Sequence, residues 1–288
     1  MKKTEEEMLA ASAGVGAAID QSSEQHRPEE LSDENKEQEK GSANHVTVVY
    51  PYSKYSVQGK ELMYALRSLQ KNVRFGINVV VIGDHEDWFS EEITFIPHER
   101  TSENTQVDLV EKLKLAIKSP DVTDTFILSA ADIYFMQPVS MAHIELPKVS
   151  GLIDISMYKG IDADNASHTL SLLKKENLPC LNYDTNTPVV FNKELLDDLI
   201  SAIPDKLTQG CLLASLYYNS QPYPTLPVLL DWPTDQVLLP VVSQRPEEKK
   251  VVELLTHKPF LHNAASGYSE WLVDFLERSF SDTSDFEV

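Results

Sequence analysis

The run Val79-Val80-Val81-Ile82, closed by Gly83-Asp84, constrains the fold of this chain more than any other segment. A strand with one face in water alternates apolar and polar residues, whereas this run is apolar throughout, so we expect both faces to be covered. Three further segments predict strands: Val46 to Pro51, Ile93 to Ile96 and Thr125 to Ala130. Strands of this kind are typical of parallel sheets between layers of helices.

Helical patterns lie between these strands. Apolar residues recur at three- and four-residue spacing from Leu62 to Leu69, and Val107 to Ile117 predicts a second helix. The alternation predicts an α/β fold with a mainly parallel sheet flanked by helices. The second half predicts a strand, three helices and a proline-rich loop: Pro188 to Phe191, Lys193 to Ile203, Cys211 to Tyr218, Ser269 to Phe280, and Pro222 to Pro233.

Residues 1–44 differ in composition from the rest and contain no Phe, Trp or Tyr. Such a segment cannot bury enough apolar surface to offset its chain entropy, so we expect a disordered acidic tail. A single α/β domain is predicted for residues 45–288. The tail could bind a protein partner.

The whole chain has 45 acidic and 25 basic residues. This balance argues against binding to nucleic acid or to an anionic membrane, because affinity for those polyanions comes mainly from clustered Lys and Arg. No apolar run is long enough to span a bilayer, and the acidic residues after Met1-Lys2-Lys3 do not fit a signal peptide, so a cytoplasmic location is predicted. Cys180 and Cys211 are expected to be buried packing residues.

Several catalytic motifs are missing from the sequence. It contains no GxGxxG, no GxxxxGK[ST], no HExxH and no GxSxG. Dinucleotide enzymes, P-loop NTPases, zincins and α/β-hydrolases are therefore disfavoured.

Asp132 is the most informative polar residue, because it follows the strand predicted to end at Ala130. Ligands of open α/β sheets bind outside the carboxyl ends of the strands. Delivery of an Asp to that edge, followed by aromatic residues and a Pro, is typical of α/β glycosyltransferases, where a metal ion held by the Asp neutralises the donor diphosphate. The competing interpretation is that Asp132 caps a turn.

Other polar groups have ordinary structural interpretations. The DxD sequence Asp162-Ala163-Asp164 is interpreted as a coincidence in a loop, and Asp231 and Asp235 as turn residues. The segment Asp84 to Asp87 is interpreted as a solvated polar turn, although it contains residue types that can bind a metal ion. His257 and His262 are interpreted as structural.

Four segments, in this order, resemble blocks of the Stealth family of sugar-phosphate transferases. They are Tyr64 to Asn72 with Val79 to Asp84 and Trp88, then Phe126 to Val139, then Asn182 to Glu194, and finally Phe260 to Asn263 with Phe280 to Glu287. The resemblance implies a nucleotide-diphospho-sugar-transferase (GT-A-like) fold, transfer from a nucleotide-sugar donor to a glycan acceptor in polysaccharide biosynthesis, and an Mn²⁺ or Mg²⁺ cofactor.

With this resemblance, Asp132 is predicted as catalytic residue and metal anchor, and Asn186 as a second catalytic-site residue. Arg67, Asp84, Lys112 and Lys193 are predicted to bind the donor or its phosphates. The chain departs from the family's polar positions at three places, where it carries Ala130-Ala131, Asn186 and Ala264.

Because of these departures, a catalytically degenerate relative with a binding or structural role in a multi-protein assembly, such as a viral particle, is an alternative to an active transferase. A plain glycan-binding module is a third hypothesis. It rests on the aromatic residues Tyr217, Tyr218, Tyr223 and Trp232, for which packing in the core is the ordinary explanation.

Overall fold

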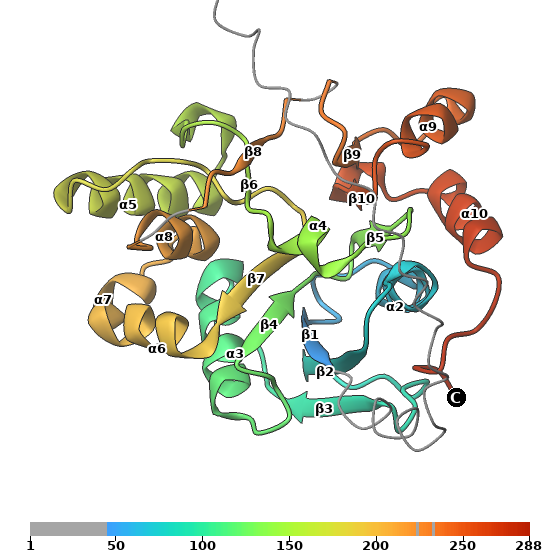
Figure 1. The fold of residues 1–288 in the computed structure, drawn as a ribbon, viewed down its shortest axis with the longest axis horizontal. Helices are drawn as coiled ribbons and strands as arrows, with labels where there is room; N and C mark the ends of the chain where they lie inside the picture. Colours follow the sequence, from blue (N-terminus) through green and yellow to red (C-terminus); the bar gives the residue numbers. More distant parts are fainter. Residues whose placement is uncertain (1–44, 223–224, 232–233) are drawn as a thin grey trace, which may run out of the picture. The chain divides into compact units, whose positions relative to one another are not determined.

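Strand β1 (Val46–Tyr52) is the middle strand of a five-stranded sheet in a computed structural model that describes residues 45–222, 225–231 and 234–288. The strand order is β3-β2-β1-β4-β7 (Figure 1). Strands β2 (Ile77–Gly83) and β4 (Thr125–Leu128) both run parallel to β1, and β3 (Ile93–Pro97) runs parallel to β2. The edge strand β7 (Val189–Asn192) is antiparallel to β4. The predicted α/β class with a mainly parallel sheet is confirmed.

Side chains along the central strands alternate between two hydrophobic cores, one on each face of the sheet. On β1, Val48 and Tyr50 pack into one core and Val49 packs into the other. On β2, Val79 and Val81 pack into the first of these cores, and Val80 and Ile82 pack into the second. Burial on both faces is the reason that these strands read as unbroken apolar runs.

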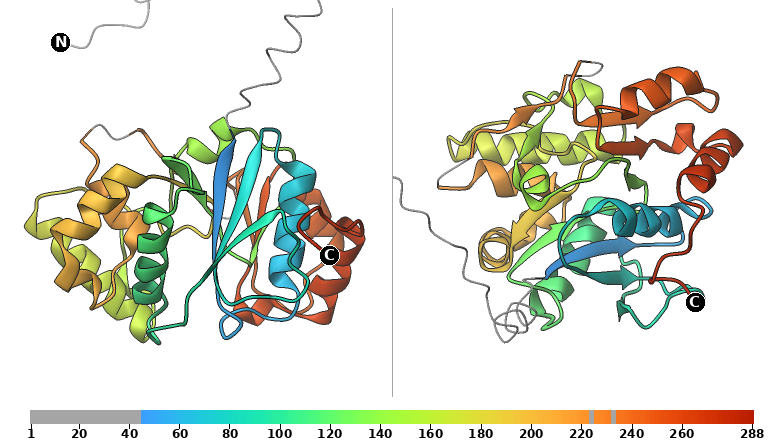
Figure 2. Two further views of the ribbon diagram at one scale, coloured as in Figure 1. Left: turned by 90° about the horizontal axis from the view of Figure 1, so that it is seen from below. Right: turned by 45° about the vertical axis from the view of Figure 1, so that its right-hand side comes forward.

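Helices cover both faces, as Figure 2 shows. The apolar sides of α2 (Glu61–Asn72) and α10 (Glu270–Ser279) pack into the core that contains Tyr50. Helices α3 (Thr105–Lys118) and α6 (Lys193–Ala202) pack into the core that contains Val49. The predicted boundaries of these helices agree with the structure to within two residues, except that α2 extends three residues beyond the predicted end at Leu69.

A second, three-stranded sheet covers part of the α2 face. It has the order β5-β10-β9, with β5 (Ile133–Phe135) antiparallel and β9 (Leu238–Val241) parallel to β10 (Phe260–Asn263). The pairing places Ile133 opposite His262, and the backbone N–H of Asn263 donates to the carbonyl of Asp132. Strand β10 therefore fixes the backbone that carries Asp132.

The remaining described elements are short, apart from two longer helices. They are α4 (Met141–Glu145), β6 (Lys148–Val149), η3 (Ile155–Met157), α5 (Ile161–Lys175), α7 (Pro204–Leu207), α8 (Leu213–Asn219), β8 (Val228–Leu229), α9 (Glu248–Leu255) and η4 (Ala265–Gly267).

Four sequence-based expectations need correction. The strand predicted to end at Ala130 ends at Leu128, so the pocket edge begins two residues earlier. Asp162 and Asp164 lie in the first turn of α5 and not in a loop, because acidic side chains favour the positive end of the helix dipole. The proline-rich segment contains the short strand β8, which pairs with β6. Cys211 is buried as expected, whereas Cys180 is partly exposed.

The tyrosines of α8 protect the open edge of the central sheet. The hydroxyl of Tyr218 accepts from the N–H of Val190 and donates to its carbonyl at 2.6 Å, and the hydroxyl of Tyr217 accepts from the N–H of Asn192. The backbone groups of an unpaired strand edge are prone to pairing with other chains, and these hydroxyls form hydrogen bonds with them instead. This structural role explains two of the four aromatic residues behind the glycan-binding hypothesis, and Tyr223 and Trp232 lie outside the described residues.

The described part of the chain belongs to one compact unit, Asn44–Val288. The predicted disordered tail, residues 1–44, lies outside the described residues and stays a prediction. Among the helices in the described ranges, none has the length and apolar character needed to cross a membrane.

Candidate functional site

A pocket of about 300 Å³ opens at the carboxyl ends of β1 and β4. The chain winds from β1 to β2 and β3 on one side, and then crosses to β4 on the other side of β1, so the pocket lies at a topological switch point. Open α/β sheets bind ligands at such points. The polar and charged residues of its wall are Ser53, Ser56, Glu61, Arg100, Thr105, Gln106, Asp108, Lys112, Ser129, Asp132, Asp184, Thr185, Asn186 and Thr187.

Asp132 lies in the pocket wall, where the chain leaves β4 and enters β5. Its Oδ2 is 3.3 Å from Nε2 of His262, and the two side chains are 37% and 12% exposed, respectively. The imidazole therefore contacts one carboxylate oxygen, while Asp132, the more exposed of the two, lines the pocket and His262 does not. Of the predicted site residues, Asp132 is the one whose position agrees best with a ligand-contacting role.

Glu61 extends this acidic side of the pocket from the first turn of α2. Its carboxylate accepts from the backbone N–H of Gln58 and from Nδ2 of Asn263, each at 2.7 Å. Burial raises the pKa of Glu61, while these two hydrogen bonds oppose the shift. Asn263 in turn accepts from the hydroxyl of Tyr134 at 2.8 Å. The group is thus held in place by a buried hydrogen-bond chain.

Asp184 reaches the pocket because β7 is antiparallel. That strand direction brings the loop before β7 to the edge where β4 ends, with Val189 opposite Leu128. Burial and, to a lesser extent, the nearby Asp162 raise the pKa of Asp184 to about 6, while His262 opposes the shift. A carboxyl that ionises near neutral pH can accept or release a proton during a reaction.

Asn186 is exposed in the same loop and has a φ of 52°. This left-handed conformation is tolerated better by Asn than by most residues. Next to it, the hydroxyls of Thr185 and Thr187 are hydrogen-bonded to each other at 2.9 Å. The predicted site residue Asn186 therefore lies in the pocket, and its backbone shape is an additional reason for an Asn there.

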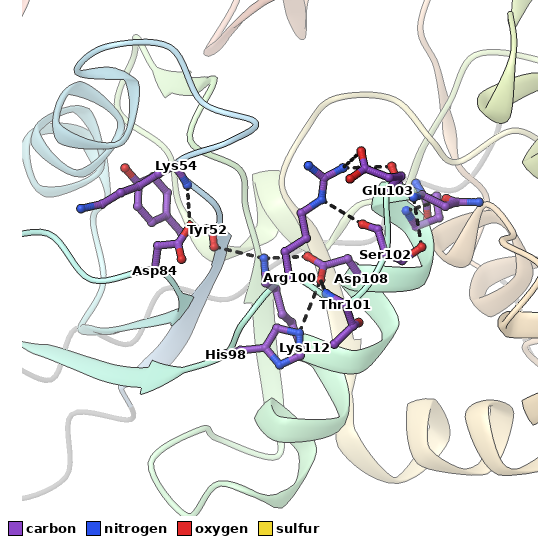
Figure 3. Close-up of polar contacts among 12 residues, drawn as sticks. Tyr52, Lys54, Asp84, His98, Arg100, Thr101, Ser102, Glu103, Asp108 and Lys112 are labelled. Atoms are coloured by element: carbon purple, nitrogen blue, oxygen red, sulfur yellow. Dashed lines mark hydrogen bonds and ion pairs between the residues drawn. The ribbon is translucent and has the colours of Figure 1, made fainter.

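Lys112 and Asp108 form a buried ion pair on the opposite wall, at 2.8 Å, one turn apart on α3 (Figure 3). Lys112 Nζ also donates to the carbonyl of Tyr52 at 3.0 Å. Asp108 accepts from the backbone N–H of Thr101 and lies 3.4 Å from Nε2 of His98. Burial favours a raised pKa for Asp108, but the hydrogen bond and charge of Lys112, with the Thr101 N–H and His98, lower it.

Arg100 lines the pocket from the loop between β3 and α3. Its Nε donates to the carbonyl of Ser102 at 2.8 Å, and one Nη donates to the carbonyl of Glu103 at 3.0 Å (Figure 3). The guanidinium carbon lies 4.6 Å from the ring centroid of Tyr55, a side chain that is itself exposed. Backbone carbonyls and an aromatic face therefore orient this cation.

Two buried hydroxyls between the sheet and the pocket have no hydrogen-bond partner among the described residues. They belong to Ser129, which lines the pocket, and to Tyr50, which lies beside it on β1. A buried hydroxyl without a partner costs free energy, and such groups are rare in native proteins. The two hydroxyls are close enough that Ser129 opposes the burial-raised pKa of Tyr50, but no hydrogen bond of ordinary geometry joins them, so Ser129 can offer one to a ligand.

The predicted divalent metal ion is not matched by a set of ligands. Across residues 45–222, 225–231 and 234–288, no three His, Cys, Asp or Glu side chains are grouped as a cation site. Asp132 is followed by no second carboxylate on β5 and is preceded by Ala130 and Ala131, whose methyl groups cannot bind metal. A hard cation prefers several oxygen ligands, so the residues present do not fit a metal site built by this chain alone.

Three predicted phosphate-binding residues lie away from the pocket wall. Arg67 pairs with Glu287 at 2.6 Å on the outer side of α2. Asp84 accepts from the backbone N–H of Lys54 at 2.7 Å, which orders the loop after β1. Lys193 Nζ donates to the carbonyl of Ser119 at 2.8 Å, at the opposite end of β4. The structure brings Asp132, Asn186 and Lys112 together, but not these three.

Sequence reasoning did not select Arg100, Glu61, Asp184 or Ser129. Arg100 and Ser129 had a usable signal, since each comes within three residues of the end of a strand in the parallel sheet. Glu61 and Asp184 come to the site through α2 and through the antiparallel β7. The direction of β7 cannot be read from the residues around it.

The strand order and the pocket define an α/β protein with a candidate ligand site at its switch point. No protein-family model matches the chain, and no curated protein matches its sequence. The resemblance to the Stealth family therefore stays a prediction.

Solved structures similar to this chain include two glycosyltransferases. Apo mouse xyloside xylosyltransferase 1 is 12% identical, with a TM-score of 0.39, and the match covers 78% of this chain and 98% of that one. The apo bifunctional glycosyltransferase WbbM is 10% identical, with a TM-score of 0.47, and the match covers 83% of this chain and 50% of that one.

Proposed function

We propose that this chain is a sugar transferase that binds a nucleotide-sugar donor in the switch-point pocket. The observation that carries the proposal is that the wall of one pocket combines a carboxylate side with a cation. Glu61, Asp132 and Asp184 make up the carboxylate side and supply hydrogen-bond acceptors suited to sugar hydroxyls, and Arg100 supplies a cation suited to phosphate.

The proposed reaction transfers the sugar to an acceptor hydroxyl. The bond between the anomeric carbon and the phosphate oxygen breaks, and the nucleoside diphosphate leaves with the electron pair. A new bond forms between the anomeric carbon and the acceptor oxygen, whose proton passes to a carboxylate of the pocket. Asp184 is the best-placed base, because its pKa of about 6 leaves it ionised but still basic near neutral pH.

Asp132 has a different role in this proposal. His262 contacts one of its oxygens at 3.3 Å, which restricts the orientation of the carboxylate. A fixed acceptor in the pocket can bind hydroxyls of the donor sugar and position the anomeric carbon for attack. Asn186 adds an amide from the same loop as Asp184 and can contact the acceptor.

The proposal is tested by incubating the purified chain with nucleotide sugars and mixed glycan acceptors. Release of the nucleoside diphosphate that depends on the acceptor, and that is lost in Asp184→Asn, is the expected result. Hydrolysis of no donor, together with no thermal shift from any nucleotide sugar, would contradict the proposal.

A second candidate function is a non-catalytic relative that binds sugar nucleotides or glycans within a protein assembly. It is favoured by Ala130 and Ala131, which stand where the Stealth-like pattern has polar residues, and by the absence of a grouped metal-ligand set from the described residues. Donor binding without turnover with any acceptor would favour this candidate. The acidic tail is then the proposed tether to a protein partner.

A further inference from the structure

A nucleotide-sugar donor brings a diphosphate, whose negative charges must be compensated when they leave water. An ion that is buried without a partner is costly, so a diphosphate site needs either a metal ion or cationic side chains. The question for this pocket is which of these two sources its residues can supply. The inference below rests on the proposed function and specifies how the same pocket holds its donor.

The carboxylate side of the pocket is poorly arranged for a metal ion. Asp132 already has His262 at 3.3 Å, and Glu61 uses both carboxylate oxygens to accept hydrogen bonds from Gln58 and Asn263. Within the part of the chain that the structure describes, no three ligand-type side chains come together. A divalent cation would find one partly exposed carboxylate, Asp132, and one carboxylate already hydrogen-bonded through both oxygens, which is fewer ligands than a hard cation prefers.

Lys112 is a pocket cation whose charge is already compensated. Asp108 lies 2.8 Å from its Nζ, both side chains are less than a tenth exposed, and Nζ also donates to the Tyr52 carbonyl. Removing Asp108 from this buried pair to free Lys112 for a phosphate would leave an uncompensated carboxylate. Lys112 therefore has a structural role in the pocket wall, and little of its charge is available to an anion.

Arg100 differs from Lys112 in how far its charge is compensated. Its acidic contact is Glu103, at 3.4 Å and 80% exposed, and an ion pair of that kind contributes little in water. Its other acceptors are the neutral carbonyls of Ser102 and Glu103, which orient the guanidinium without cancelling its charge. Nη1 makes no hydrogen bond to any residue in the described ranges, so part of the fork is free for a ligand.

The surroundings of Arg100 also favour a phosphate ligand. The guanidinium stacks over Tyr55 at 4.6 Å, which restricts its rotation and lowers the entropy lost when it binds. Its side chain is 18% exposed, so the field of the charge is screened less than at an open surface. Arginine binds phosphate through two parallel N–H···O bonds.

We propose that Arg100 binds the diphosphate of the donor and that this binding does not require a divalent metal ion. Arg100 is then a binding residue for the leaving group, stabilising the negative charge that develops as the nucleoside diphosphate departs. The carboxylate side of the pocket remains available for the sugar and the acceptor.

The first test measures binding to the full chain by calorimetry, with UDP, GDP, UDP-glucose and GDP-mannose as probes. Each titration is done with EDTA and again with Mg²⁺ or Mn²⁺. We expect at least one probe to bind with an affinity that changes by less than about threefold between the two conditions. Binding that appears only with metal would overturn the inference but would leave the proposed function standing.

The second test uses substitutions of Arg100. Arg100→Gln should weaken binding of the same probe by at least about tenfold, and Arg100→Lys should weaken it less, because a point charge replaces the fork. Arg74→Gln is the matched control, since Arg74 is an exposed arginine outside the pocket. Thermal unfolding of each variant shows whether it is folded.

The outcomes distinguish the role of Arg100 from the proposed function. Unchanged affinity in folded Arg100→Gln overturns the role of Arg100, whatever the metal dependence. Absence of binding by every probe, with and without metal, overturns the proposed function and the inference together. The comparison of EDTA with metal uses the unmodified chain, so it decides the metal question even if an Arg100 variant fails to fold.

Discussion

Arg67 on α2 and Glu287 near the C-terminus are joined by two hydrogen bonds, of 2.8 and 2.6 Å, between guanidinium and carboxylate. Arg67 also donates to the carbonyl of Phe280, and Glu287 accepts from the backbone N–H and the hydroxyl of Ser284. The side chains are 13% and 5% exposed. Both partners of this pair also belong to segments of the Stealth-like pattern, so in this chain the matching residues hold the C-terminus on α2 and do not meet in the pocket.

Breaking this pair should destabilise the fold. Glu287→Gln leaves the mostly buried Arg67 without a countercharge, and we expect the free energy of unfolding to fall by about 3 kcal/mol. Chemical denaturation measures this loss, and Glu91→Gln, at an exposed glutamate, is the control. A change no larger than that of the control would show that the pair contributes nothing to stability.

The same pair should make stability depend on pH in the acid range. Burial tends to raise the pKa of Glu287, but the hydrogen bonds from Arg67 and Ser284 hold it below its usual value. A carboxyl with a lowered folded pKa stabilises the protein above its unfolded pKa, and this contribution is lost as the pH falls through the folded pKa. We therefore expect the difference in stability between the wild type and Glu287→Gln to be largest near neutral pH and to shrink on acidification.

Asp132 should be essential for transfer but not for folding. We expect Asp132→Asn to lower the transfer rate by at least about a hundredfold, because an amide is a weaker acceptor for sugar hydroxyls and cannot keep its contact with His262 in both orientations. Asp164→Asn is the matched control, since Asp164 belongs to the DxD sequence but lies exposed on α5. Equal transfer rates for the two variants would show that Asp132 has no role in transfer.

Asp184 should give the transfer rate a pH dependence. Because burial raises its pKa to about 6, the carboxylate form that accepts a proton becomes populated as the pH rises through that value. The rate should therefore increase with pH and level off above about pH 7, and the pH profile of single-turnover transfer measures this limb. Asp162→Asn, which removes the neighbouring negative charge that raises the pKa, should move the limb to lower pH. A profile that does not move would mean that another group titrates.

The stability of Asp184→Asn should change in the opposite direction to its activity. A carboxyl with a raised folded pKa destabilises the protein at pH values above its unfolded pKa, and the cost is complete above the folded pKa. Replacing it by Asn should thus stabilise the fold by on the order of 2 kcal/mol near neutral pH and have little effect in strong acid. Denaturation at both pH values tests the sign.

The parts of this fold that the sequence predicts are those that local patterns of apolar residues specify. Val79 to Ile82 lies between two helix layers, so every side chain is buried and the sequence shows an unbroken apolar run. The helix pattern from Leu62 to Leu69 is equally local. The small sheet was not predictable, because β5 and β10 are short and pair across a long stretch of chain, where no local pattern specifies the partner.

The candidate site was predictable only in part, for a related reason. Asp132 follows a strand of the parallel sheet, and the rule about carboxyl ends is sufficient to place it. Arg67 and Lys193 were assigned by resemblance, and their tertiary partners, Glu287 and the Ser119 carbonyl, cannot be inferred from residue spacing. Arg100 was not selected, because a single Arg in a polar loop becomes informative only when its tertiary contacts and its place in the pocket wall are known.

A comparison of Ser129 with Ser68 tests whether the Ser129 hydroxyl binds a ligand. Both are buried, but Ser68 donates to the carbonyl of Ala65 at 2.7 Å and accepts from the N–H of Phe135 at 3.0 Å, whereas Ser129 Oγ has no partner among the described residues. Ser68→Ala should destabilise the protein by about 1 to 2 kcal/mol, because it leaves the Phe135 N–H unsatisfied. Ser129→Ala should leave the free energy of unfolding unchanged or raise it slightly, because it removes a hydroxyl that was already unsatisfied. In the same Ser129→Ala variant, calorimetry should show weaker binding of the nucleotide sugar that binds the wild type. A stability loss equal to that of Ser68→Ala, with unchanged ligand affinity, would mean that Ser129 has a structural role alone.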